Sequence, residues 1–160
     1  MLQHDFNRMR TVGEDRTARG AAACVPRMIG EKLRRAGLRP TRQRLALGWL
    51  LFGKGDRHLT AETLHAEASA ARMNMSLATV YNTLHQFTEC GLLREVALFG
   101  SKAWYDTNTG PHYHYYIEEK EELFDIPEAM LPQLNLPASP EGMIVAGIDV
   151  IIRLKKAAEL

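Results

Sequence analysis

The 160-residue sequence predicts an α+β fold, with a winged-helix domain over residues 26–108 followed by a small α/β domain over residues 109–160. Three observations predict it. Capping residues precede three amphipathic segments of the first domain, a β-hairpin pattern follows the last of them, and short strand patterns occupy the second domain. Residues 1–25 show no hydrophobic periodicity, and we expect a flexible extension there.

Four helices are expected in the first domain, over residues 26–36, 42–52, 61–71 and 77–90. Pro26 suits the first turn of the first helix, because its missing N–H would have no intrahelical partner there. Residues whose hydroxyl oxygen can cap a helix N-terminus precede the other three: Thr41, Thr60 and Ser76. Gly37 and Gly91 follow the first and last helices, where glycine commonly ends a helix.

A hairpin completes the expected winged helix. Residues 92–99 and 102–107 are rich in β-favouring side chains and turn at Gly100-Ser101. The sequence NTGP at residues 108–111 then reads as a connector between the two domains.

The second domain is expected to contain strands and little helix. Its predicted strands span residues 112–117, 122–126 and 143–154, with a proline-rich loop over 131–140. About fifty residues bury too little apolar surface for a stable core. We therefore expect this domain to dimerise with a second copy of the chain.

Charge is distributed unevenly along the chain. Residues 1–57 carry 13 Lys/Arg against 5 Asp/Glu, whereas residues 111–160 carry 4 against 9. A basic front and an acidic back are typical of a protein that presents one end to phosphates. A solvated basic tail is the simpler alternative.

Other compositional features exclude several classes of protein. No apolar run approaches the ~18 residues needed to span a membrane, and the N-terminus lacks the apolar core of a secretory signal, so we expect no membrane partner and a cytoplasmic location. Cys24 and Cys90 are the only cysteines. Without a Cys-x-x-Cys pair, a four-cysteine structural zinc site is excluded.

The last helix of the first domain has a face suited to reading DNA. On a helical wheel its core face comprises Leu77, Val80, Leu84 and Phe87. The opposite face is polar and uncharged, with Tyr81 on its flank: Thr79, Asn82 and Gln86. Amide groups can pair with adenine, and a Thr methyl or Tyr ring can pack on thymine methyls. Phosphate contacts would come from arginines on neighbouring elements: Arg34, Arg35, Arg39, Arg42 and Arg44. The simpler alternative is an amphipathic helix with a solvated face.

Two histidines suggest a metal or haem site. In a strand His112 and His114 share one face, about 6–7 Å apart by the strand repeat. Asp106, Asp125 and His58 are available to complete a His/carboxylate set suited to Fe²⁺, Mn²⁺ or Zn²⁺. Two exposed strand histidines are the simpler alternative. A small metalloenzyme is a further alternative, but no nucleophile or general-base motif accompanies the histidines, so we expect no enzymatic activity.

Several of these motifs together resemble the ferric uptake regulator (Fur) superfamily. They are GLRPTRQR (37–44), HLTAETL (58–64), SLATVYNTL (76–84) and the series Asp106, His112, His114, Asp125. The resemblance covers about residues 27–126. It implies a dimeric regulator of transcription in which Tyr81 contacts a base and Arg39 enters the minor groove. It also implies a regulatory metal site formed by His58, Asp106, His112, His114 and Asp125.

The subgroup is indicated by what is missing. Most of the superfamily carries a Cys-x-x-Cys zinc site after the histidines, where Ile117 and Lys120 stand here. Together with GWLLFGKGDRHLTAE and TVYNTL, this resembles the iron response regulator (Irr) subgroup of alphaproteobacteria. That resemblance implies haem sensing through His112 and His114, and control of haem-synthesis and iron-metabolism genes at AT-rich operators. The alternative is a Fur-like repressor that is active when loaded with Fe²⁺ or Mn²⁺.

Overall fold

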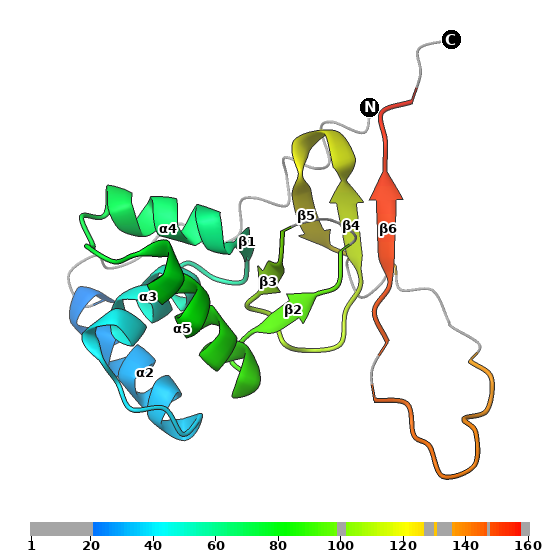
Figure 1. Ribbon diagram of the computed structural model, residues 1–160, viewed down its shortest axis with the longest axis horizontal. Helices are drawn as coiled ribbons and strands as arrows, with labels where there is room; N and C mark the ends of the chain where they lie inside the picture. Colours follow the sequence, from blue (N-terminus) through cyan, green and yellow to red (C-terminus); the bar gives the residue numbers. More distant parts are fainter. Residues whose placement is uncertain (1–20, 99–101, 127–129, 131–135, 147, 158–160) are drawn as a thin grey trace.

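The computed structural model describes residues 21–98, 102–126, 130, 136–146 and 148–157. The described helices gather at one end of the molecule, and two small sheets follow (Figure 1). The helices are α2 (Ala21–Arg35), α3 (Arg42–Phe52), α4 (Ala61–Ala70) and α5 (Leu77–Glu89). The strands are β1 (His58–Thr60), β2 (Arg94–Val96), β3 (Trp104–Asp106), β4 (His114–Ile117), β5 (Glu122–Asp125) and β6 (Ile151–Leu154). None of the described helices is long and apolar enough to cross a membrane.

The predicted starts of α3, α4 and α5 are confirmed by their caps. In each case the capping hydroxyl accepts a hydrogen bond from the backbone N–H three residues further on: Thr41 from Arg44, Thr60 from Thr63, and Ser76 from Thr79. The predicted start of α2 at Pro26 was wrong. The helix begins at Ala21, because the alanines ahead of the proline favour helix. The rest of the predicted extension lies outside the described residues.

The ends of α2 and α5 are also as predicted. Gly37 and Gly91 have φ of +77° and +72°, a left-handed conformation that glycine adopts without a steric penalty. This conformation lets the next N–H turn back onto the helix, so Leu38 donates to the Leu33 carbonyl at 2.8 Å. Helix α5 ends in the same way, with Leu92 donating to the Phe87 carbonyl at 2.8 Å, so both of its ends are fixed by local sequence.

The hydrophobic core lies among the helices. Its fully buried side chains include Leu33, Leu47, Leu51, Leu59, Leu64, Val80, Leu84 and Phe87. Three of the four residues on the predicted core face of α5 are thus buried, and Leu77 packs at the edge of the same cluster. Helices α2 and α3 approach closely, since a Cβ at Gly48 would lie 2.7 Å from Ile29 Cγ2.

The first sheet has the order β1-β3-β2, with antiparallel pairing throughout. The predicted hairpin is present as β2 and β3, but both strands are shorter than the predicted 92–99 and 102–107. Its expected turn at Gly100-Ser101 lies outside the described residues. Strand β1 was not predicted. It has only three residues and runs directly into the Thr60 cap of α4, so it is too short to show a strand pattern.

The second sheet has the order β5-β4-β6, in which β4 is antiparallel to β5 and parallel to β6. Two predictions here were wrong in extent. The strand expected at 112–117 begins at His114, and the strand expected over 143–154 is limited to Ile151–Leu154. Residues 143–146 have no regular structure and are exposed, with Ile144 90% exposed. Among the described residues, no other segment buries these apolar side chains.

Candidate metal centre and DNA-reading surface

Five side chains converge where the two sheets meet. One ligand atom from each lies within 4.8 Å of every other: His58, Asp106, His112, His114 and Asp125. These are the five residues that the sequence assigned to a metal site. His114 and Asp106 are almost completely buried, and His112 is 9% exposed.

Strand register brings these residues together. In the first sheet His58 of β1 lies directly opposite Asp106 of β3. In the second sheet His114 of β4 lies directly opposite Asp125 of β5. The cluster therefore consists of one cross-strand pair from each sheet, and His112 from the segment between them. The expectation that His112 itself lies in a strand was wrong, because pairing starts two residues later.

The nitrogen and oxygen atoms in the cluster are closely spaced. His112 Nε2 lies 2.8 Å from Asp106 Oδ2 and 3.2 Å from Asp125 Oδ1. His58 Nε2 lies 2.9 Å from Asp125 Oδ1 and 3.5 Å from Asp106 Oδ2. His114 Nε2 lies 2.9 Å from His112 Nε2 and 3.3 Å from Asp106 Oδ2. Each carboxylate thus faces all three imidazoles with one oxygen.

Two ring nitrogens have features expected of metal ligands. His112 Nδ1 donates to the Gly110 carbonyl at 2.8 Å, which leaves the lone pair of a neutral ring on Nε2, toward the cluster. His58 Nε2 is close to both carboxylates, but neither contact is aligned as a hydrogen bond, so the atom is buried without a hydrogen-bond partner among the described residues. Once its proton is displaced, a cation at the centre of the cluster would satisfy it.

The carboxylates dominate the electrostatics of the cluster. Burial by itself lowers the pKa of His58, but the proximity and charge of Asp106 and Asp125 outweigh burial and raise that pKa from 6.5 to about 9. Burial opposes ionisation of Asp106, yet contacts with His114 and His58 and the Asn108 N–H hold its pKa well below 3.8. The pKa of Asp125 is lowered too, with His58 outweighing burial. Both aspartates are therefore ionised at neutral pH, which favours a cation.

Asn108 orients both aspartates by bonding the carboxylate oxygen of each that does not face the cluster. Its backbone N–H donates to Asp106 Oδ1 at 2.8 Å, and its side-chain amide donates to Asp125 Oδ2 at 3.4 Å. The second oxygen of each carboxylate is thereby held away from the cluster. The side-chain Oδ1 of Asn108 also accepts a hydrogen bond from the Gly110 N–H at 3.1 Å. Sequence reasoning treated Asn108 only as part of a connector, although an asparagine next to a predicted ligand and a glycine is a signal for such a turn.

Arg94 of β2 connects the same segment to the end of the chain. It donates to the Gly110 carbonyl at 3.4 Å, the carbonyl that also holds His112, and it forms an ion pair with Asp149 ahead of β6. A contact therefore runs from a candidate ligand through Gly110 and Arg94 to the second sheet. Sequence reasoning missed this contact, because the partners are 55 residues apart.

The spacing of the five atoms fits a transition-metal ion. An ion held at about 2.1 Å by each of two adjacent ligands places those ligands about 3 Å apart. The contacts between imidazole nitrogen and carboxylate oxygen atoms of the cluster run from 2.8 to 3.7 Å. Three imidazoles and two carboxylates form a mixed donor set that suits Fe²⁺, Mn²⁺ or Zn²⁺.

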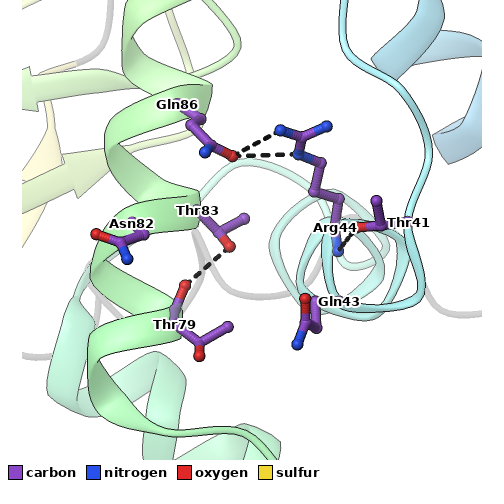
Figure 2. A pocket seen from close by; sticks show the side chains of 7 residues that line it. All are labelled: Thr41, Gln43, Arg44, Thr79, Asn82, Thr83 and Gln86. Atoms are coloured by element: carbon purple, nitrogen blue, oxygen red, sulfur yellow. Dashed lines mark hydrogen bonds between the residues drawn. The ribbon is translucent and has the colours of Figure 1, made fainter.

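The polar face of α5 borders a cleft of about 320 Å³ between α3 and α5 (Figure 2). Its lining includes all three residues of the polar face that the sequence singled out: Thr79, Asn82 and Gln86. The other lining residues are Thr41, Gln43, Arg44 and Thr83. Gln86 is not free, since its Oε1 accepts two hydrogen bonds from Arg44.

The remaining candidate DNA-contacting residues are exposed and do not line this cleft. Tyr81 is exposed on α5, outside the cleft, and its hydroxyl donates to Glu62 Oε1 of α4 at 2.5 Å. Arg39 is exposed in the connector between α2 and α3, and Arg42 is exposed at the first position of α3. Arg42 adjoins the lining residues Thr41 and Gln43, and Arg44 links the backbone of Arg39 to Gln86 of α5.

A winged-helix domain joined to a buried His/Asp cluster defines the class of metal-responsive transcriptional regulators. The chain belongs to the ferric uptake regulator family, whose family model matches residues 35–144. Members of this family regulate transcription and are not enzymes.

Individual relatives agree with this assignment. The chain is 36% identical over 103 residues to the peroxide-responsive repressor PerR of Staphylococcus aureus (strain Mu50 / ATCC 700699), a match that covers 64% of this chain and 67% of that protein. The structure of the ferric uptake regulator from Pseudomonas aeruginosa with manganese superposes with a TM-score of 0.63 at 23% identity, covering 81% of this chain and 98% of that one. The structure of the Vibrio cholerae ferric uptake regulator (Fur) also superposes with a TM-score of 0.63. The two sequences are 20% identical, and the match covers 79% of this chain and 98% of that one. These structural likenesses show the fold.

Proposed function

We propose that this protein is a transcriptional repressor that binds operator DNA as a homodimer when a divalent cation occupies the cluster of His58, Asp106, His112, His114 and Asp125. The observation that carries the proposal is the convergence of two ionised carboxylates and three imidazoles at the junction of the two sheets. The similarity to a peroxide-responsive repressor supports repression as the outcome.

The residues of the site suggest how an ion would affect DNA binding. A bound divalent cation would balance the negative charges of the two ionised aspartates. His58 and Asp106 belong to the sheet of the DNA-binding domain, whereas His114 and Asp125 belong to the second sheet. Ligation of all of them favours one relative orientation of the two sheets. An ion shifts the population of that orientation only by binding it more tightly than other orientations.

Fe²⁺ and Mn²⁺ are the cations that we favour, with Zn²⁺ as a competitor. Both carboxylates reach the cluster although their side chains are short, and they bring hard oxygen ligands beside the nitrogens. A purely tetrahedral zinc site would use four of the five groups and leave one imidazole or carboxylate outside the coordination sphere.

The haem-sensing hypothesis depends on the same pair of histidines. Haem iron needs an imidazole that faces an open surface large enough for the macrocycle. Here His112 and His114 are buried, and their Nε2 atoms face each other and two carboxylates. These contacts favour an ion over haem at this site. Haem titration tests the alternative directly: a Soret band that is lost in a His112→Ala/His114→Ala variant would support the iron response regulator hypothesis.

An exposed apolar segment supports the homodimer. Met143, Ile144 and Val145 are 67%, 90% and 54% exposed, and they precede strand β6. A contiguous exposed apolar surface of this kind commonly marks an interface, and a second copy of the chain is the partner that we propose. Sedimentation that shows a stable monomer at micromolar concentration would contradict this part.

The reading surface is tested by selecting operator duplexes from a randomised library with Mn²⁺ present. We expect AT-rich sequences, bound through α5 with Tyr81 on a base and with Arg39 in the minor groove. Tyr81→Ala should weaken binding to the selected duplex by about tenfold or more, since each good base contact contributes about 1–3 kcal/mol. Full affinity in this variant would count against the assignment of α5 as the reader.

The metal site is tested separately by Mn²⁺ titration. His112→Ala/His114→Ala should lose stoichiometric binding. His85→Ala, which removes an exposed histidine of α5, is the control and should retain it. Equal Mn²⁺ affinity in the double variant and the wild type would contradict the site.

A further inference from the structure

Arg44 connects two parts of the proposed reading surface, and Figure 2 shows its side chain bonded to Gln86. Its Nη1 donates to the backbone carbonyl of Arg39 at 2.8 Å. Its Nε and Nη2 donate to Oε1 of Gln86 on α5 at 3.1 and 2.9 Å. One guanidinium therefore holds both the connector that carries Arg39 and the face of α5 that borders the cleft.

The position of Arg44 is itself fixed. Its backbone N–H donates to the capping hydroxyl of Thr41, so it lies in the first turn of α3, and its side chain is half-buried. The planar fork of an arginine can bond several acceptors in a fixed geometry, whereas a lysine presents one ammonium group on a flexible stem. Lysine at position 44 would keep the charge and lose the simultaneous contacts.

These contacts change how Gln86 can read DNA. An amide pairs bidentately with adenine by using both its oxygen and its nitrogen. Here the oxygen is held by Arg44, so only the NH₂ group is available toward the cleft. Gln86 can then donate to an acceptor such as guanine O6 or thymine O4, and the bidentate pairing with adenine that its residue type suggested is not available.

We propose that Arg44 is a positioning residue for DNA recognition. It sets the distance and orientation between Arg39, which enters the minor groove, and α5, which enters the major groove. It thereby fixes which spacing of minor-groove and major-groove features the protein accepts. The inference depends on the proposed function, since it assumes operator binding by Arg39 and α5. It replaces the sequence-based expectation that Arg44 contacts phosphate, because the guanidinium is directed toward groups of the protein itself.

The test compares Arg44→Lys and Arg44→Ala in binding the selected operator duplex over a range of salt concentrations. If Arg44 positions the surface, both variants bind roughly tenfold more weakly than the wild type, because both lose hydrogen bonds from a charged group. The salt dependence of binding stays that of the wild type, and sequence preference at the minor-groove positions is relaxed. Arg27→Lys, an exposed arginine of α2, controls for the substitution and should bind as the wild type does.

A phosphate contact would give a different result. Arg44→Lys would then bind nearly as well as the wild type, and Arg44→Ala would lower the salt slope by about one. That pattern would overturn the proposal. Folding of each variant is checked by circular dichroism.

Gln86→Ala provides a second route if an Arg44 variant does not fold. It should relax the same minor-groove preference, although Gln86 does not touch Arg39. Where both variants fold, Arg44→Lys/Gln86→Ala should be no weaker than the weaker single variant. The proposal would be overturned if the losses of operator affinity in the two single variants added up in the double variant. It would also be overturned if Gln86→Ala kept the sequence preference of the wild type at the minor-groove positions. Absence of operator binding by the wild-type protein would instead refute the proposed function, and this inference with it.

Discussion

Metal binding should release a proton from His58. In the metal-free protein its pKa lies at about 9, because Asp106 and Asp125 outweigh the effect of burial. At about pH 7 the ring is therefore protonated, and an ion must displace that proton before Nε2 can act as a ligand. About one proton per ion should be released by His58 at this pH, about half a proton at about pH 9, and almost none above about pH 10.

The size of the effect follows from the same pKa. Between about pH 7 and about pH 9 the apparent Mn²⁺ affinity should rise by roughly fiftyfold, with a slope close to tenfold per pH unit at the lower end, and it should level off near about pH 10. Calorimetric titration in buffers of different ionisation enthalpy counts the released protons. His58→Gln should bind Mn²⁺ more weakly, with an affinity that varies less over this range. An affinity that does not change between about pH 7 and about pH 9 would refute the reasoning.

The raised pKa of His58 also makes the stability of the metal-free protein depend on pH. This stability should fall as the pH rises, whereas the Mn²⁺ affinity should increase. The folded-state pKa of His58 is raised above the unfolded value of 6.5. The resulting stabilisation is fully present below about pH 6.5 and is lost as the pH rises through about 9. Thermal unfolding with a chelator present should show this loss in the wild type and a smaller one in His58→Gln.

Further predictions concern the support of the site, a helix cap and the core. Asn108→Ala removes the side-chain contacts with Asp125 and Gly110 and keeps the backbone bond to Asp106. It should weaken Mn²⁺ binding by about tenfold to a hundredfold, as is typical for groups that orient metal ligands. Asn74→Ala is the exposed control, and a loss below about twofold would contradict the role of the Asn108 side chain. Ser76→Ala should destabilise the protein by about 1 kcal/mol in urea unfolding, because it removes the cap of α5, and an unchanged midpoint would argue against the cap. Leu47→Ala should lower the free energy of unfolding by about 2–5 kcal/mol, because Leu47 is fully buried. Leu136→Ala, at an exposed position, should lower it by less than about 0.5 kcal/mol. Similar losses in the two variants would contradict the assignment of the core.

Local signals in the sequence determine much of the first domain. Thr41, Thr60 and Ser76 each cap the helix that follows them, so three helix starts could be predicted from single residues. The periodic apolar face of α5 likewise predicted which side is buried. Such features depend on contacts within three or four residues, which a linear sequence displays.

Features that depend on pairing between distant segments could not be predicted in the same way. Strand β1 exists because it pairs with β3, and nothing in three residues shows it. The apolar alternation over 143–154 predicted a long strand, but only the segment that pairs with β4 becomes one. Periodicity indicates what a strand would bury, and the partner decides whether it forms.

The candidate site was predictable in its members and not in its surroundings. Residue types at metal-ligand spacing, together with a family resemblance, identified the five residues that the structure brings together. The amide of Asn108 and the contact from Arg44 to Gln86 were not foreseen, since both depend on side-chain directions that spacing does not define. These contacts orient the groups that the sequence could name.

The central claim is that the ion at the junction of the sheets and operator DNA are coupled. The most direct test is the Mn²⁺ affinity of the wild-type protein, measured with and without the selected operator duplex. Coupling between two sites is reciprocal, so an ion that promotes DNA binding must bind more tightly when DNA is present. We predict an affinity at least about fivefold higher with the operator. Equal affinities in its presence and absence would contradict the account.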